Sequence, residues 1–179
     1  MADAAQDHAP RSYAWGPQSA FGLTVAVLAC DIDQASKFWL LYGFDLPGHS
    51  RVALTPFIEL LVTWNTGISY GLLQGQGAVG QWALLAFKVA AVVFLWAWLA
   101  RSTSRVTAAA LGLIIGGAVG NAADRLHWPG VFDFVLFHFE TATWSFRWYV
   151  FNAADVAIVA GVFALLYESL RGGSAAKAP

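Results

Sequence analysis

The stretches GGAVGNAADR (residues 116–125) and FNAADVAI (residues 151–158) decide the fold of this chain. Each places an asparagine three residues before an aspartate in an otherwise apolar segment: Asn121 before Asp124, and Asn152 before Asp155. A carboxylate at membrane depth costs roughly 2.5–3.5 kcal/mol, so such a residue marks a functional site. We therefore predict that the two aspartates meet in one pocket of a membrane protein, where they perform acid–base chemistry.

The composition of the whole chain indicates the same class of protein. Hydrophobic residues make up 58% of the 179 residues and charged residues 12%, and the mean hydropathy is +0.57. Soluble domains carry about 25% charged residues. The formal net charge of −1 gives no electrostatic basis for binding nucleic acid. The single cysteine, Cys30, excludes an intrachain disulfide.

Four segments are long and apolar enough to span a bilayer, which requires about 20 residues. We expect an all-α membrane protein with four transmembrane helices in one integral membrane domain, residues 1–179, that ends in a disordered tail, about 172–179. The expected spans are about 19–41, 79–100, 106–123 and 151–170.

Basic residues near the ends of the spans predict the orientation. Both termini are expected in the cytoplasm, which places five basic residues there: Arg11, Arg101, Arg105, Arg171 and Lys177. Asp33, Asp124 and Asp155 then lie at one depth near the outer face. This agreement supports the predicted pair, because the pairing was not used to derive the topology.

The two outer segments are expected to form a small β-rich extracytoplasmic region at the outer membrane surface. Residues 43–78 contain prolines and glycines around the apolar run FIELLVTW, a pattern of short strands and turns. In residues 143–149, aromatic side chains alternate with polar ones, which is typical of a strand with one apolar face. Aromatic residues at this density favour the headgroup layer.

Two neighbouring carboxyl groups do not both ionise easily, so they share one proton. The charged member can deprotonate a water molecule while the protonated member donates a hydrogen bond to a substrate carbonyl. Such chemistry requires no metal and no cofactor. The histidines show no recognisable metal-binding spacing.

Structural roles are possible for the same residues. Asp124 can form a surface ion pair with Arg125, and Asn152 can cap a helix that carries Asp155 in its first turn. Asp33 and Lys37, one helical turn apart, can neutralise each other. The segment Asn65–Thr66–Gly67 can be an ordinary turn.

The sequence is also compatible with other functions, and it allows two orientations for one further charged residue, Lys88. A small proton-coupled transporter could use Asp124 and Asp155 as a relay, although inverted repeats and midplane carboxylates would be expected there. A non-catalytic scaffold protein would not explain why two carboxylates lie at the same depth in the membrane. The amine of Lys88 can extend towards the membrane surface or face the helix bundle.

Five motifs occur in an order that resembles the lipoprotein signal peptidases, also called signal peptidase II. The motifs are DQASK (33–37), NTGISYG (65–71), GGAVGNAADR (116–125), VFDFV (131–135) and FNAADV (151–156). The resemblance implies an aspartic endopeptidase of the bacterial inner membrane whose active site faces the periplasm. Its substrates would be prolipoproteins carrying a diacylglyceryl cysteine, cut just before that cysteine. It would act as a monomer in contact with membrane lipid.

The motifs also imply roles for single residues. Asp124 and Asp155 match the catalytic dyad of the family. The matches to supporting and substrate-binding positions are Asp33, Lys37, Asn65, Gly67, Asn121, Arg125, Asn152 and Ala154. Ser69 and Tyr70 depart mildly from the pattern, where Ala and Phe are common, and the segment after Asp133 is long.

Overall fold

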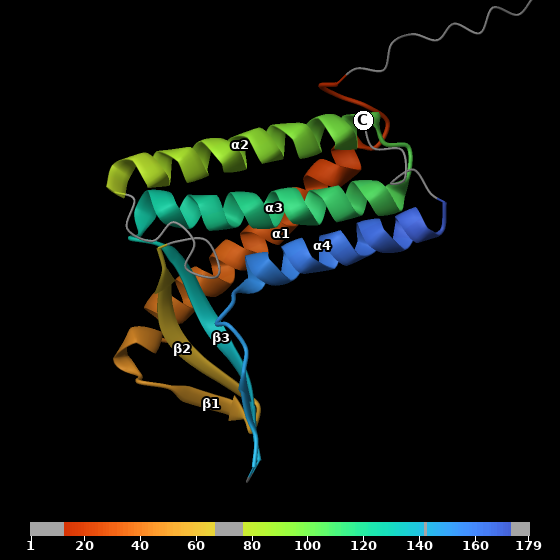
Figure 1. Cartoon of the computed structure of the whole chain (residues 1–179). Coiled ribbons are helices and arrows are strands. Elements are labelled where there is room, and N and C mark those ends of the chain that lie inside the picture. Colours follow the sequence, from red (N-terminus) through yellow and green to blue (C-terminus); the bar gives the residue numbers. More distant parts are fainter. Residues whose placement is uncertain (1–12, 67–76, 142, 173–179) are drawn as a thin grey trace, which may run out of the picture.

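The computed structural model describes residues 13–66, 77–141 and 143–172. Four helices form a bundle, and a small sheet projects from one of its ends (Figure 1). The helices are α1 (Ser19–Phe38), α2 (Gly77–Arg101), α3 (Arg105–His127) and α4 (Ala153–Leu170). The strands are β1 (Val52–Thr55), β2 (Ile58–Asn65), β3 (Val131–Glu140) and β4 (Ser145–Arg147). Two short helical turns, η1 (Trp39–Gly43) and η2 (Leu46–Gly48), connect α1 to the sheet.

Helix α3 lies at the centre of the bundle because glycines let its neighbours approach closely. It packs against α1 and α4, and to a lesser extent against α2. A Cβ atom on Gly112 would lie 2.5 Å from the carbonyl oxygen of Gly22 in α1, and one on Gly117 would lie 2.5 Å from that of Ala154 in α4. Small residues at these positions permit the close helix contacts typical of membrane bundles.

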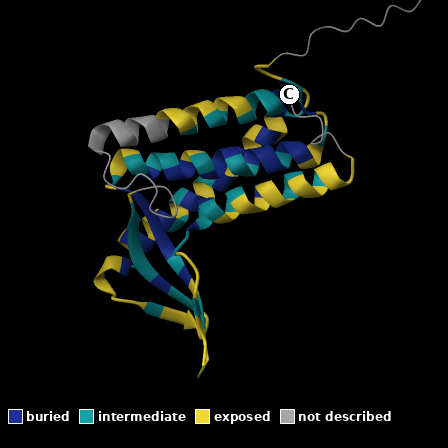
Figure 2. Cartoon of the chain, viewed as in Figure 1, coloured by how far each residue is buried: buried dark blue, intermediate teal, exposed yellow. Residues whose placement is uncertain are grey.

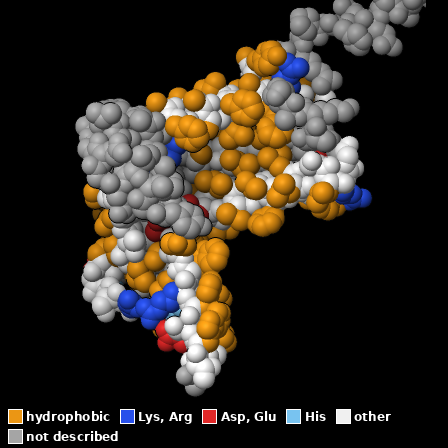
Figure 3. Space-filling model, in the orientation of Figure 1, with side chains coloured by type: hydrophobic (Ala, Val, Ile, Leu, Met, Phe, Trp, Pro, Cys, Tyr) orange, Lys and Arg blue, Asp and Glu red, His pale blue; other side chains and the backbone are white. Residues whose placement is uncertain are grey.

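The outer surface of the bundle is apolar. In Figure 2 the exposed residues lie on the outward faces of α2 and α4, and Figure 3 shows hydrophobic side chains across the bundle. On α4 alone, Val156, Val159, Phe163 and Leu166 are exposed. A contiguous exposed apolar surface of this kind marks contact with a membrane or another protein.

Two described helices, α3 and α4, are long and apolar enough to cross a membrane by length and composition. Helix α1 carries three charged residues, Asp31, Asp33 and Lys37. All four predicted spans coincide with helices, with the end of α3 extended to His127. The four-span topology itself stays a prediction.

The sheet makes the fold mixed rather than purely helical. Its four strands are antiparallel in the order β1-β2-β3-β4. The expected strands around FIELLVTW and in residues 143–149 are confirmed as β2 and β4. Strand β3, the longest with ten residues, was not predicted. Its first seven residues are apolar except for Asp133, so they lack the alternation that identifies a half-buried strand.

The sheet is anchored to the bundle by its own apolar core and by β3. Buried residues of η1, η2, β2 and β3 form this core, which comprises Leu40, Leu41, Leu46, Leu60, Phe132 and Phe134. Strand β3 begins four residues after α3 ends, and Val135 forms an isolated bridge with Phe151 just before α4. The end of α3 and the starts of β3 and α4 therefore meet at one place, which is where the predicted site residues lie.

Candidate active site

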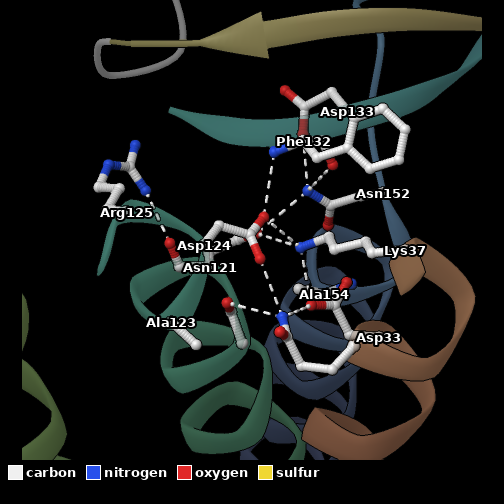
Figure 4. A network of polar contacts seen from close by, with 12 residues as sticks. Asp33, Lys37, Asn121, Ala123, Asp124, Arg125, Phe132, Asp133, Asn152 and Ala154 are labelled. Atoms are coloured by element: carbon white, nitrogen blue, oxygen red, sulfur yellow. Dashed lines mark hydrogen bonds and ion pairs between the residues drawn. The ribbon is translucent and has the colours of Figure 1, made fainter. Parts of the chain in front are cut away.

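Lys37 lies at the centre of a buried ionic network at this junction (Figure 4). Its Nζ atom is 2.7 Å from Asp33 Oδ2 and 2.7 Å from Asp124 Oδ2, and it donates a 3.3 Å hydrogen bond to Asn121 Oδ1. The side chains of all three charged residues have no exposed surface. One ammonium thus compensates two buried carboxylates, a broader role than the predicted neutralisation of Asp33 alone.

Asp33 connects three helices. It shares a face of α1 with Lys37, one turn further on, and it packs against Gly120 of α3, where a Cβ atom would lie 2.6 Å from Asp33 Oδ2. Its other oxygen, Oδ1, accepts a 2.9 Å hydrogen bond from the backbone N–H of Ala154 in the first turn of α4. The N–H groups at a helix start lack partners within the helix, so a carboxylate there is stabilising.

Both carboxylate oxygens of Asp124 have hydrogen-bonding or ion-pair partners. Besides the contact with Lys37, its Oδ2 atom accepts a 3.0 Å hydrogen bond from the backbone N–H of Phe132, and its Oδ1 atom accepts a 2.9 Å bond from Gln34 Nε2. Asp124 is completely buried, so it is not the surface partner of Arg125 that one interpretation of the sequence allowed. Its contacts join α3 to α1 and to the start of β3.

Asn152 caps α4 and also contacts the rest of the site. Its Oδ1 atom accepts from the backbone N–H of Asp155 at 3.0 Å, and its own N–H donates to Asp155 Oδ2 at 3.1 Å, which makes a reciprocal capping box. Its Nδ2 atom donates to Asn121 Oδ1 at 3.0 Å and to Asp133 Oδ1 at 2.6 Å. The capping role suggested by the sequence is confirmed, and a bridging role is added to it.

Asp133 belongs to this site, although the sequence interpretation assigned it no role. It is 3% exposed on β3, and its second oxygen, Oδ2, accepts a 3.2 Å hydrogen bond from Asn65 Nδ2. Burial raises the pKa of Asp133 to about 6, and the negative charge of Asp155 acts in the same direction. Hydrogen bonds from Asn65 and Asn152 and the charge of Lys37 oppose this rise. The signal in the sequence was an aspartate within the apolar motif VFDFV.

Asp155 is partly exposed and is held by two asparagines. Its Oδ1 atom accepts a 3.0 Å hydrogen bond from Asn121 Nδ2, and its Oδ2 atom accepts the bond from the backbone of Asn152. The predicted pairing of Asp155 with Asp124 differs from these contacts, because the carboxylate of Asp124 is directed to Lys37. The carboxyl group linked to Asp155 through Asn152 is that of Asp133.

The structure brings most of the predicted site residues together. Those that meet at the junction are Asp33, Lys37, Asn65, Asn121, Asp124, Asn152, Ala154 and Asp155. Arg125 donates a 3.0 Å hydrogen bond to the backbone carbonyl of Asn121 at the edge of this group. Gly67, Ser69 and Tyr70 lie outside the described residues. Within the described ranges, no group of three or more His, Cys, Asp or Glu residues could hold a metal ion.

Comparison with known proteins identifies the family. The profile of the signal peptidase (SPase) II family matches residues 25–171. The lipoprotein signal peptidase of Rhodopseudomonas palustris (strain TIE-1) is 57% identical over 158 residues, covering 88% of this chain and 96% of that protein. The lipoprotein signal peptidase of Nitrobacter hamburgensis is 56% identical with the same coverage.

A solved structure has the same fold. It is a bacterial membrane enzyme determined by the in meso method at 2.3 Å resolution, with a TM-score of 0.69 and 21% sequence identity, covering 85% of this chain and 88% of that one. At this identity the similarity concerns the fold. The family profile and the two closely similar relatives establish more than the fold: this chain belongs to the signal peptidase II family of lipoprotein-processing proteases.

Proposed function

We propose that this protein is an aspartic endopeptidase that removes signal peptides from diacylglyceryl-modified prolipoproteins, cutting just before the modified cysteine. The observation that carries this proposal is the link between Asp133 and Asp155. Asn152 hydrogen-bonds the side chain of the first and both the backbone and the side chain of the second. Two carboxyl groups held by one asparagine, Asp133 by its side chain and Asp155 by its backbone N–H, can divide the acid and base roles of peptide hydrolysis.

The surroundings of the two carboxyl groups differ, and this difference supports a division of the acid and base roles between them. Asp155 is partly exposed, accepts two hydrogen bonds and occupies the first turn of α4, where the helix dipole stabilises a negative charge. Asp133 is buried and its pKa is raised to about 6, which favours the neutral acid. A substrate that covers the pair removes water and favours the neutral form of Asp133 further. We therefore assign Asp155 as the base and Asp133 as the acid.

The reaction then needs no group beyond the two aspartates and one water molecule. Asp155 accepts a proton from the water, whose oxygen attacks the carbonyl carbon of the peptide bond, while Asp133 donates its proton to the carbonyl oxygen. In the resulting gem-diol, Asp155 returns a proton to the amine nitrogen as the C–N bond breaks. A gem-diol hydroxyl proton passes to Asp133, which restores the starting state.

The remaining residues of the site support this pair. Asp33, Lys37 and Asp124 form the buried ionic network that fixes α1, α3 and the start of β3. Asn121 and Asn65 each donate to one member of the pair. We assign Arg125, Ala154 and Gly67 to substrate binding or site support, as their motif positions imply, and no cofactor is required by this chemistry.

The proposal includes a place for the enzyme in the cell. The chain would form one integral peptidase domain of the bacterial inner membrane with four spans, both termini in the cytoplasm and the active site towards the periplasm. It would act as a monomer. A substrate with two acyl chains has to approach sideways through the lipid, since each CH₂ group withdrawn into water costs about 0.8 kcal/mol.

The decisive experiment measures cleavage of a diacylglyceryl-modified precursor by three nearly isosteric variants. We expect Asp133→Asn and Asp155→Asn to abolish cleavage and to remain folded. Asp124→Asn is expected to lower thermal stability, because it disturbs the contact with Lys37, while its folded fraction still cleaves. Near-normal cleavage by Asp133→Asn or Asp155→Asn would contradict the proposed pair. Complete loss of cleavage only in Asp124→Asn and Asp155→Asn would restore the pairing first expected from the sequence.

A further inference from the structure

Lys88 is a charged residue in the apolar helix α2 that the proposed reaction does not use. It lies at the head of a stripe, Lys88–Val92–Leu95–Leu99, whose spacing of four, three and four residues defines one face of a helix. The three apolar members of the stripe belong to the cluster that contains Leu111 and Ile115 of α3. Lys88 continues that face, so its side chain starts on the side of α2 that packs against α3, whereas its neighbours Phe87 and Val89 are exposed.

The position of Lys88 along the bundle brings its amine towards the active site. Helices α2 and α3 run in opposite directions from the connection at residues 102–104. At 1.5 Å per residue, Lys88 lies roughly 20 Å from Arg101 and Asn121 lies roughly 24 Å from Arg105. A lysine side chain that extends by about 6 Å therefore reaches the level of Asn121. Arg125 repels the Lys88 ammonium, and Asp155 and Asp124 attract it, so it lies within their electrostatic range.

The balance of positive and negative charges at the junction suggests a role for the Lys88 amine. The described ionisable groups around the junction include four carboxylates, Asp33, Asp124, Asp133 and Asp155, and two other cations, Lys37 and Arg125. Lys37 is in direct contact with Asp33 and Asp124, and Arg125 is hydrogen-bonded at the edge of the site. With one proton on the pair Asp133 and Asp155, the cluster is neutral only if Lys88 carries its charge. An uncompensated charge in a membrane is costly.

We propose that Lys88 is a positioning residue that supplies the third positive charge and keeps the pair Asp133 and Asp155 singly protonated. Within the part of the chain that the structure describes, the Lys88 amine makes no ion pair or hydrogen bond of its own. It therefore acts through its field rather than through contact with the reacting atoms. The inference rests on the proposed function of this pair as the catalytic carboxylates.

The test is the pH dependence of kcat/KM for the full-length enzyme on a diacylglyceryl-modified precursor. In Lys88→Met, removal of the positive charge makes both protons of the pair harder to lose, so both limbs of the profile move to higher pH. The expected shift is roughly one to two pH units, the size produced by a unit charge several ångströms away at an effective dielectric constant of about 20. Lys88→Arg restores the charge and should follow the wild-type profile.

Val89→Met is the matched control, because it places the same side chain on the exposed face of α2 at the same depth. It should leave the profile unchanged. If Lys88→Met does not fold, Lys88→Gln keeps a polar side chain and carries the same expectation. A profile of Lys88→Met or Lys88→Gln that superimposes on the wild type overturns the inference, as does an equal shift in Lys88→Arg. Active Asp133→Asn or Asp155→Asn enzyme would instead overturn the proposed pair, so the two failures are distinguishable.

Discussion

The amide of Asn152 donates a 2.6 Å hydrogen bond to Asp133 Oδ1 while the same side chain caps helix α4. The cap fixes the first turn of α4, and with it the carboxyl group of Asp155. The bond to Asp133 fixes the start of β3 against that turn. One side chain thus sets the relative position of two carboxyl groups that come from different elements.

Asn152→Ser separates these two functions. Serine is about as good an N-cap as asparagine, but its hydroxyl is too short to replace the amide that reaches Asp133. A hydrogen bond to a charged or acidic group contributes about 1.5–3 kcal/mol, so the cleavage rate should fall roughly 10–100-fold. The unfolding temperature should fall as well, because the buried oxygens of Asn121 and Asp133 lose this donor. Asn152→Ala, which loses the cap in addition, should lower the unfolding temperature further. Wild-type cleavage by Asn152→Ser would show that the bond to Asp133 does not position the pair.

The raised pKa of Asp133 predicts how stability depends on pH. This carboxyl group, whose usual pKa is 3.8, titrates at about 6 in the folded protein. Between these values the folded state holds a proton that the unfolded state has lost, so this contribution to stability is full below about pH 4 and is lost as the pH rises to about 6. The loss amounts to roughly 3 kcal/mol.

Thermal unfolding of the detergent-solubilised protein between about pH 4 and pH 7 measures this effect. Asp133→Asn lacks the titrating group, so its unfolding temperature relative to that of the wild type should increase as the pH rises through this range. A constant difference between the two proteins would mean that Asp133 titrates alike in the folded and unfolded states.

Features set by local sequence were predicted correctly. The apolar lengths located all four helices, and the motif around Asn152 indicated its cap, because capping depends on residues only a few positions apart. The aromatic alternation located β4 for the same reason. In each case the pattern and the structure that it produces lie within one element.

The ion-pair and hydrogen-bond partners of the charged side chains could not be predicted from local sequence patterns. Lys37 and Asp124 meet across 87 positions of sequence, and nothing in the spacing of Asn121 and Asp124 shows that a lysine from α1 neutralises this aspartate. Asp133 was missed because β3 looks like a continuous apolar run. Its importance arises only when Val135 pairs with Phe151 and brings β3 beside the start of α4. The similar spacing in the two asparagine–aspartate motifs therefore predicted Asp124 as the partner of Asp155, whereas the partner that we propose is Asp133.

The contact between Lys37 and two carboxylates predicts strong coupling in stability. Lys37→Gln leaves Asp33 and Asp124 buried without a cation, which should lower the free energy of unfolding by about 3–5 kcal/mol. Adding Asp124→Asn removes one of the uncompensated charges, so the double variant should be more stable than Lys37→Gln alone. Thermal unfolding of the four proteins of this double-mutant cycle measures the coupling. Additive effects would show that the two residues do not interact.

The proposed orientation can be tested with single cysteines. In a Cys30→Ala background, Thr103→Cys in the connection between α2 and α3 should react with a membrane-impermeant thiol reagent only from the cytoplasmic side. His49→Cys, next to the sheet, should react only from the periplasmic side. Labelling in intact spheroplasts and in inverted vesicles makes the comparison, with the cysteine-free protein as the control. Reaction of both positions from the same side would rule out the proposed four-span arrangement.

Gly120→Ala tests whether Asp33 is fixed against α3. Alanine is a better helix former than glycine by about 1 kcal/mol, so the substitution would stabilise an unobstructed helix. Here the new Cβ atom would lie 2.6 Å from Asp33 Oδ2, a carboxylate that also contacts Lys37 and the backbone of Ala154. Because these contacts leave it little room to move, we expect a loss of roughly 1–3 kcal/mol and weaker cleavage. A gain in unfolding temperature would mean that the carboxylate moves aside freely and does not hold α1, α3 and α4 together.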